Sequence, residues 1–142
     1  MKNTFKIAAM LLIFAGIIAC GKKEMQEYEI YGNHDIEACG IEDPLKNIEW
    51  LKLLCSEIIQ NKEDIHSSFK IDLYEENETR EHVILIPYSP YKKIFNYGVY
   101  TCSGESTVYY AGISGEVSLV PHAYPLHQYC TYVSTLWSIT IK

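Results

Sequence analysis

The hydrophobic period of this chain changes once, and that change constrains its fold more than any other feature. Between Asp43 and Lys62 one face at helical spacing is apolar, made of Leu45, Ile48, Leu51, Leu54, Cys55, Ile58 and Ile59. Asp43 is a suitable N-cap, and Pro44 suits the first helical position. From Phe69 onward the period is two, which is typical of half-buried strands. We therefore expect one amphipathic helix followed by a sheet.

Strands are predicted at 69–74, 82–88, 97–102, 106–112 and 136–141. Residues 103–105, Ser-Gly-Glu, have the length and glycine of a hairpin loop between the third and fourth strands. No strand–helix–strand alternation appears, so the sheet is expected to be antiparallel. The predicted fold class is α+β, with one N-terminal amphipathic helix packed on an antiparallel sheet of about four to five strands in two layers.

The N-terminus has the layout of a secretion signal. Lys2 and Lys6 precede an uncharged apolar run over residues 7–18. As a helix this run would reach only about 18 Å, which is too short for a hydrocarbon core of about 30 Å. Residues 17–20, Ile-Ile-Ala-Cys, resemble the lipobox of bacterial lipoproteins, in which a small residue precedes the cysteine that is lipidated.

The lipobox resemblance implies removal of residues 1–19 and a covalent diacylglycerol and N-acyl chain, such as palmitate, on Cys20. Two or more acyl chains hold a protein stably to a bilayer, so the membrane is an expected partner. Gly21 follows, where Asp resembles an inner-membrane retention signal in some bacteria, and this favours the outer membrane of the cell envelope. Which side of that membrane the protein faces is left open. Residues 20–38, polar and acidic, are predicted to be a lipidated tether, and residues 39–142 a single disulfide-stapled domain.

Charge and cysteine usage narrow the classes of partner and compartment. The formal net charge of −6, without clustered Lys and Arg, argues against a nucleic-acid partner. After Cys20 four cysteines remain, and an even number in an exported domain predicts two disulfides with three possible pairings. The candidates are Cys39, Cys55, Cys102 and Cys130.

The segment CGIEDPLKNIEWLK, residues 39–52, resembles the start of the domain in a group of small uncharacterised lipoproteins of Bacteroidota. That group also carries later Y-x-C-x-G and G-I-x-G motifs, which match residues 100–104 and 112–115 here. The resemblance implies a lipoprotein domain to which no activity is assigned. It supports the envelope location and the fold class, and it supplies no catalytic residue.

Aromatic residues provide the candidates for binding. Trp50 lies off the apolar stripe of the predicted helix, where an exposed aromatic ring would be a contact residue. Tyrosine suits both cross-strand packing and binding surfaces, because it has an apolar ring and a polar tip. The tyrosines of the predicted hairpin are Tyr97, Tyr100, Tyr109 and Tyr110. An envelope protein or a glycan is the expected partner of such a surface.

Metal and catalytic motifs are weak. No cofactor and no resident metal are expected. His122 and His127 are weak metal candidates beside Cys130 on the irregular segment 113–135, because their spacing matches no standard zinc pattern. Residues 112–116 miss G-x-S-x-G at the last position. Ser89-Pro90-Tyr91-Lys92 spells S-x-x-K, but Pro87 and Pro90 disfavour the helical turn that this motif needs.

The resulting hypothesis is a membrane-anchored envelope lipoprotein that acts as a non-catalytic binding or interaction module. The alternative left open is a metal-binding protein or metal-dependent hydrolase that uses the segment 113–135.

Overall fold

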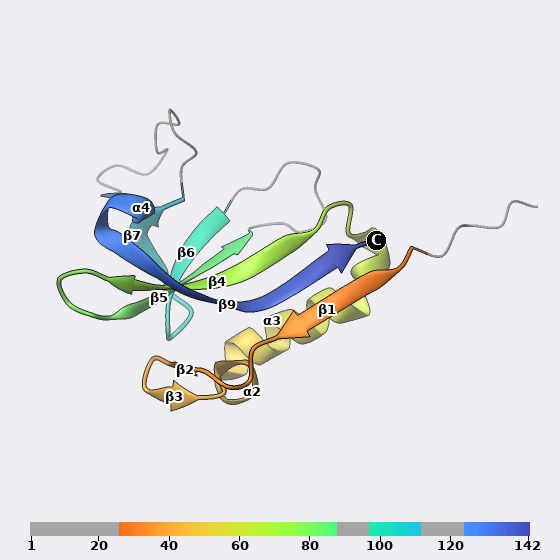
Figure 1. Ribbon diagram of the computed structural model, residues 1–142, viewed down its shortest axis with the longest axis horizontal. Coiled ribbons are helices and arrows are strands. Elements are labelled where there is room, and N and C mark those ends of the chain that lie inside the picture. Colours follow the sequence, from red (N-terminus) through yellow and green to blue (C-terminus); the bar gives the residue numbers. More distant parts are fainter. Residues whose placement is uncertain (1–25, 88–96, 112–123) are drawn as a thin grey trace, which may run out of the picture.

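The computed structural model describes residues 26–87, 97–111 and 124–142. Within these residues seven strands form one sheet in the order β1-β9-β4-β5-β6-β7-β8 (Figure 1). The strands are β1 (Tyr28–Gly32), β4 (Phe69–Glu76), β5 (His82–Pro87), β6 (Tyr97–Thr101), β7 (Ser106–Tyr110), β8 (Tyr124–Pro125) and β9 (Cys130–Ile141). All neighbours are antiparallel except β7 and β8, which are parallel.

A second sheet and three short helices complete the described part of the chain. The second sheet pairs β2 (Glu37–Ala38) with β3 (Ile41–Glu42). The helices are α2 (Pro44–Asn47), α3 (Glu49–Gln60) and α4 (Leu126–Tyr129), and a 3₁₀ turn, η1 (Lys62–Asp64), follows α3. None of the described helices is long and apolar enough to cross a bilayer.

The predicted fold class was wrong. The protein is mostly β, with a seven-stranded mixed sheet and a separate two-stranded sheet, rather than an antiparallel sheet of four to five strands under one N-terminal helix. The alternation of apolar and polar residues over 69–110 predicted only the strands β4 to β7. The outer strand β8 has two residues, and β1 lies in a polar segment without a sustained period. β9 is twice as long as the strand predicted at 136–141.

The predicted helix is also interrupted. Ile48 has extended backbone angles, φ −90° and ψ 103°, and separates the single turn of α2 from α3. Asp43 makes no side-chain cap, because its φ of 47° is left-handed and its carboxylate instead lies 2.8 Å from the Nδ1 atom of His34. The side chain of Ile48 is buried in the core, so the break adjusts the direction of α3 without exposing apolar surface.

The ordered domain begins earlier than residue 39. β1 lies within the range 20–38, which was predicted to be a tether, and it pairs with β9 from Tyr28 opposite Ile141 to Gly32 opposite Trp137. The composition of this segment is typical of a linker, but its pairing with β9, the longest described strand, makes it part of the folded domain. The predicted cleavage and lipidation sites, with residues 1–25, lie outside the described residues.

Two hydrophobic clusters lie on opposite faces of the sheet. The larger one joins α2 and α3 to the inner residues of the sheet, such as Ile71, Leu73 and Ile139, each 0% exposed. The smaller one contains Val83, Val99, Leu126 and Cys130, and α4 contributes to it. β5 shows both clusters in one strand, because Ile84 and Ile86 belong to the first cluster and Val83 to the second.

Candidate functional site

An apolar groove lies between α3 and the central strands. Its volume is about 410 Å³ and its lining is Trp50, Leu53, Leu54, Glu57, Ile86, Tyr100 and Gly104. The rings of Trp50 and Tyr100 are 6.3 Å apart between centroids and tilted by 44°. Leu53 is 59% exposed. We refer to this feature as the Trp50 groove.

The turn between β6 and β7 fixes the position of the Trp50 ring. The indole Nε1–H of Trp50 donates a hydrogen bond of 2.8 Å to the carbonyl oxygen of Cys102. Gly104 has a φ of 87°, and a Cβ added there would lie 3.1 Å from the indole ring. The backbone of this turn therefore rests against the indole, and only glycine fits that close approach at that left-handed angle.

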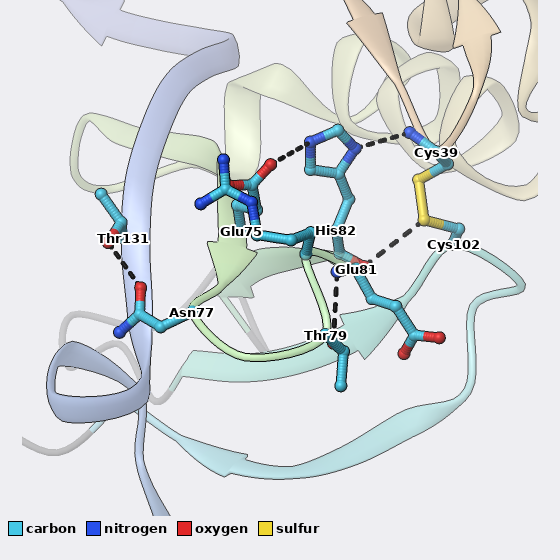
Figure 2. A network of polar contacts seen from close by, with 9 residues as sticks. Cys39, Glu75, Asn77, Thr79, Glu81, His82, Cys102 and Thr131 are labelled. Atoms are coloured by element: carbon cyan, nitrogen blue, oxygen red, sulfur yellow. Dashed lines mark hydrogen bonds and ion pairs between the residues drawn. A yellow bond between two sulfur atoms is a disulfide. The ribbon is translucent and has the colours of Figure 1, made fainter.

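A disulfide ties this turn to the segment between β2 and β3. Cys39, after β2, is bonded to Cys102, with 5.9 Å between their Cα atoms. The backbone N–H of Cys39 donates a 2.8 Å hydrogen bond to Nδ1 of His82, and Figure 2 shows the imidazole between Cys39 and Glu75. Because Nδ1 accepts this bond, the ring proton of a neutral His82 lies on Nε2, which is 3.9 Å from the Glu75 carboxylate. His82 therefore serves to hold the disulfide-bonded segment on β5.

A second and larger cavity, of about 770 Å³, is lined in part by both cysteines of this disulfide. Its lining includes the turn after β4, where the buried Glu76 carboxylate accepts hydrogen bonds from the backbone N–H groups of Glu78 and Thr79. These bonds, led by the one from Thr79 and joined by one from the Tyr109 hydroxyl, lower the pKa of Glu76. The carboxylate of Glu76 therefore holds its own turn together.

Two further polar contacts lie around this turn. Nη1 of Arg80 lies 2.8 Å from Oε1 of Glu75, and Oγ1 of Thr131 donates a 2.7 Å hydrogen bond to the side chain of Asn77 (Figure 2). Within the described residues no buried side-chain nitrogen or oxygen lacks a partner.

The structure divides the predicted binding residues between the two faces of the sheet. Trp50 and Tyr100 meet in the Trp50 groove. Tyr109 belongs to the smaller cluster on the opposite face, where its ring is 6.4 Å from that of Tyr129. Tyr97 has the parity of Val99, which also lies in that cluster, and burial and then the charge of Asp72 raise the pKa of its hydroxyl. Tyr110 ends β7 and is half-buried.

Sequence reasoning placed Leu54 on the buried stripe and did not include Ile86 or Gly104 in a binding surface. The glycine of the predicted hairpin loop was the one available signal, because a glycine in a tight turn marks close approach of a neighbouring group. Which neighbour approaches it depends on the tertiary fold and could not be read from the loop sequence.

Only one of the two predicted disulfides forms among the described residues. Cys55 and Cys130 are free and buried, and they lie in the two clusters on opposite faces of the sheet, so they cannot reach each other. Burial raises the pKa of Cys55 to about 12. Burial, and then the charge of Glu76, raises that of Cys130 to about 11. Both are packing residues with inert thiols.

The weak metal candidates are not brought together in the described part of the chain. His122 lies outside the described residues, His127 is exposed on α4, and Cys130 is buried. No group of three or more His, Cys, Asp or Glu side chains in the described residues is arranged to hold a metal ion. The hydrolase alternative stays a prediction, because much of the segment 113–135 is not described.

Comparisons with models of protein families, with curated proteins and with solved structures found no match to this chain.

Proposed function

We propose that this protein is a lipid-anchored protein of the cell envelope whose folded domain binds a partner without catalysing a reaction. The lipobox-like residues 17–20 support the anchor through Cys20. The Cys39–Cys102 disulfide supports an oxidising compartment outside the cytoplasm, because disulfides persist there and are rare inside cells. The outer membrane is the proposed location.

The pairing of Trp50 with Tyr100 across an apolar groove is the observation that carries the binding proposal. Aromatic side chains in a preformed hollow are the usual anchors of protein interfaces. The disulfide and the turn of Gly104 hold the Trp50 ring before any partner arrives, so little conformational entropy is lost on binding.

The lining favours a protein segment over a glycan. A sugar needs several hydrogen-bonding groups around an open aromatic face, whereas the indole N–H of Trp50 is already used by Cys102 and its ring is approached by Gly104. The other lining side chains are mainly aliphatic, and Glu57 carries the one carboxylate among the lining residues. We infer that the groove takes an apolar side chain of a partner protein that carries a Lys or Arg nearby, facing Glu57.

Site-specific photo-cross-linking in intact cells tests this proposal. A photoreactive residue at position 53 is expected to give a discrete protein adduct, because Leu53 is exposed at the groove. The matched control is position 52, which is exposed on the same helix and does not line the groove. The adduct is expected to weaken with Glu57→Lys. Equal adducts at positions 52 and 53, or none at position 53, would refute binding at the groove while leaving the anchor to its own test.

A further inference from the structure

β1 forms one edge of the large sheet. It is hydrogen-bonded to β9 on one side, and within the described residues no strand pairs with its other side (Figure 1). An unpaired edge presents N–H and C=O groups that can pair with another chain. Proteins usually protect such an edge with Pro, Lys or a bulge. β1, with the sequence YEIYG, has none of these in its five residues.

The hydrogen bonds at the two ends of β1 show which of its groups face outward. The backbone N–H of Lys142 donates to the carbonyl of Glu27 at 3.0 Å, and that of Asn33 donates to the carbonyl of Leu136 at 2.8 Å. Both bonds fit the register of the β1–β9 pair, so the odd-numbered residues of β1 bond to β9. Because bonding directions alternate along a strand, Tyr28, Ile30 and Gly32 direct their N–H and C=O groups to the free edge.

The side chains at this edge are apolar and exposed. Ile30 is 41% exposed and Tyr31 is 50% exposed. The only charged side chain of β1 is Glu29, and Nζ of Lys142 lies 3.3 Å from its carboxylate. The edge therefore carries little net charge to repel another strand.

We propose that the edge of β1 pairs with the same edge of a second copy of this chain, antiparallel and with the two-fold axis at Ile30. In this register Ile30 faces Ile30 of the second copy, and Tyr28 faces Gly32 of the second copy. All three outward residues of each copy then exchange both hydrogen bonds. A shift by two residues in either direction leaves outward groups of one residue unpaired in each copy.

The side chains also fit this register. Gly32 has no side chain of its own, and Leu45 and His34 lie 3.1 and 3.2 Å from the position that a Cβ of Gly32 would take, so the ring of Tyr28 from the second copy would lie beside these two side chains. Glu29 faces Tyr31 of the second copy rather than Glu29, which keeps the two carboxylates from lying directly opposite each other. The two sheets join into one continuous sheet, and the exposed Ile30 side chains cover each other.

Disulfide trapping of the full chain tests the register. Ile30→Cys places two cysteines directly opposite each other at a hydrogen-bonded pair, about 5.5 Å apart between Cα atoms, which a disulfide can span. The control Tyr31→Cys is at least as exposed but is offset from its own copy by two positions, so its two cysteines lie too far apart. The expected result on non-reducing gels is a covalent dimer for Ile30→Cys, and monomer for Tyr31→Cys and the unaltered chain. Equal cross-linking of the two variants would overturn the register.

The mass of the purified full chain in detergent, measured by light scattering over a concentration series, tests the association itself. The unaltered chain is expected to reach twice the monomer mass. Ile30→Lys puts two like charges face to face and is expected to halve that mass. Val108→Lys, at an exposed apolar residue of β7 near the other end of the sheet, is expected to leave that mass unchanged. A monomer throughout the series, or a dimer that survives Ile30→Lys, would overturn the proposal.

Discussion

The indole N–H of Trp50 donates a 2.8 Å hydrogen bond to the backbone carbonyl of Cys102, a residue 52 positions away in the sequence. This bond joins α3 to the turn between β6 and β7, and the disulfide of Cys102 joins the same turn to Cys39. Three segments that are distant in sequence thus meet beside one groove. The shape of the Trp50 groove consequently depends on the Cys39–Cys102 disulfide and on Gly104. Substitutions at these positions can test both contributions.

Gly104→Ala is expected to lower the free energy of unfolding by about 1–3 kcal/mol, because it adds left-handed backbone strain and a Cβ atom against the indole of Trp50. Gly40→Ala is the matched control, since Gly40 has a φ of 69° but no atom within 4 Å of the added Cβ. Urea denaturation measures both. Trp50 fluorescence is expected to change in Gly104→Ala alone, and equal losses of stability with an unchanged spectrum would contradict the close approach.

Replacing both Cys39 and Cys102 by serine is expected to lower the free energy of unfolding by about 4 kcal/mol, because the disulfide closes a long loop, with its cysteines 63 positions apart. Cys130→Ala, which removes a buried thiol outside any disulfide, is the control for loss of packing alone.

The burial of the two free cysteines can be tested by titrating their thiols. Cys55 and Cys130 are expected to react with iodoacetamide only after unfolding, and rapid reaction of either in the native protein would contradict their burial.

The stability of the protein is expected to fall in acid partly through Glu76. Its pKa is lowered in the folded state from an ordinary value of 4.5, so the unfolded chain binds the proton more tightly. The stabilisation is present above the ordinary value and is lost as the pH falls through the folded-state pKa. Glu76→Gln should flatten this part of the pH dependence of urea unfolding. Glu81→Gln, at an exposed carboxylate next to β5, is the matched control for the loss of one surface charge.

Cys20→Ala is expected to move the protein from the membrane fraction to the soluble fraction and to abolish incorporation of labelled palmitate. Cys55→Ala, a substitution at a cysteine buried in the core, should leave both properties intact. Continued membrane association of Cys20→Ala would refute the proposed lipid anchor. Membrane association of Cys20→Ala would not bear on partner binding at the Trp50 groove, which the cross-linking experiment tests separately.

The local pattern of the sequence was sufficient for the central strands. Phe69, Ile71 and Leu73 alternate with polar residues, and they point into the core as that alternation requires. The hairpin of β6 and β7 was likewise marked by a short loop with Gly104. These features depend on neighbours within a few residues, which a periodic pattern can report.

Features set by distant neighbours could not be predicted. β1 is ordered by β9 at the other end of the chain, so its polar surroundings made it resemble a tether. Cys55 and Cys130 could not be distinguished from the bonded cysteines, because only the fold puts them on opposite faces of the sheet. For the same reason the sequence named Trp50 and Tyr100 as candidates but did not show that they form one groove and that Tyr97 and Tyr109 lie on the other face.

The pairing of β1 with β9 also has a mechanical consequence. Tension applied to the chain at residue 26 enters the domain through β1, which five register pairs hold to β9. A pull along the strand loads all of these pairs at once in shear, whereas a pull across the sheet would open them one after another. The resistance of this domain to force therefore depends on the direction of the pull, and a second strand on the free edge of β1 would double the number of ladders that share the load.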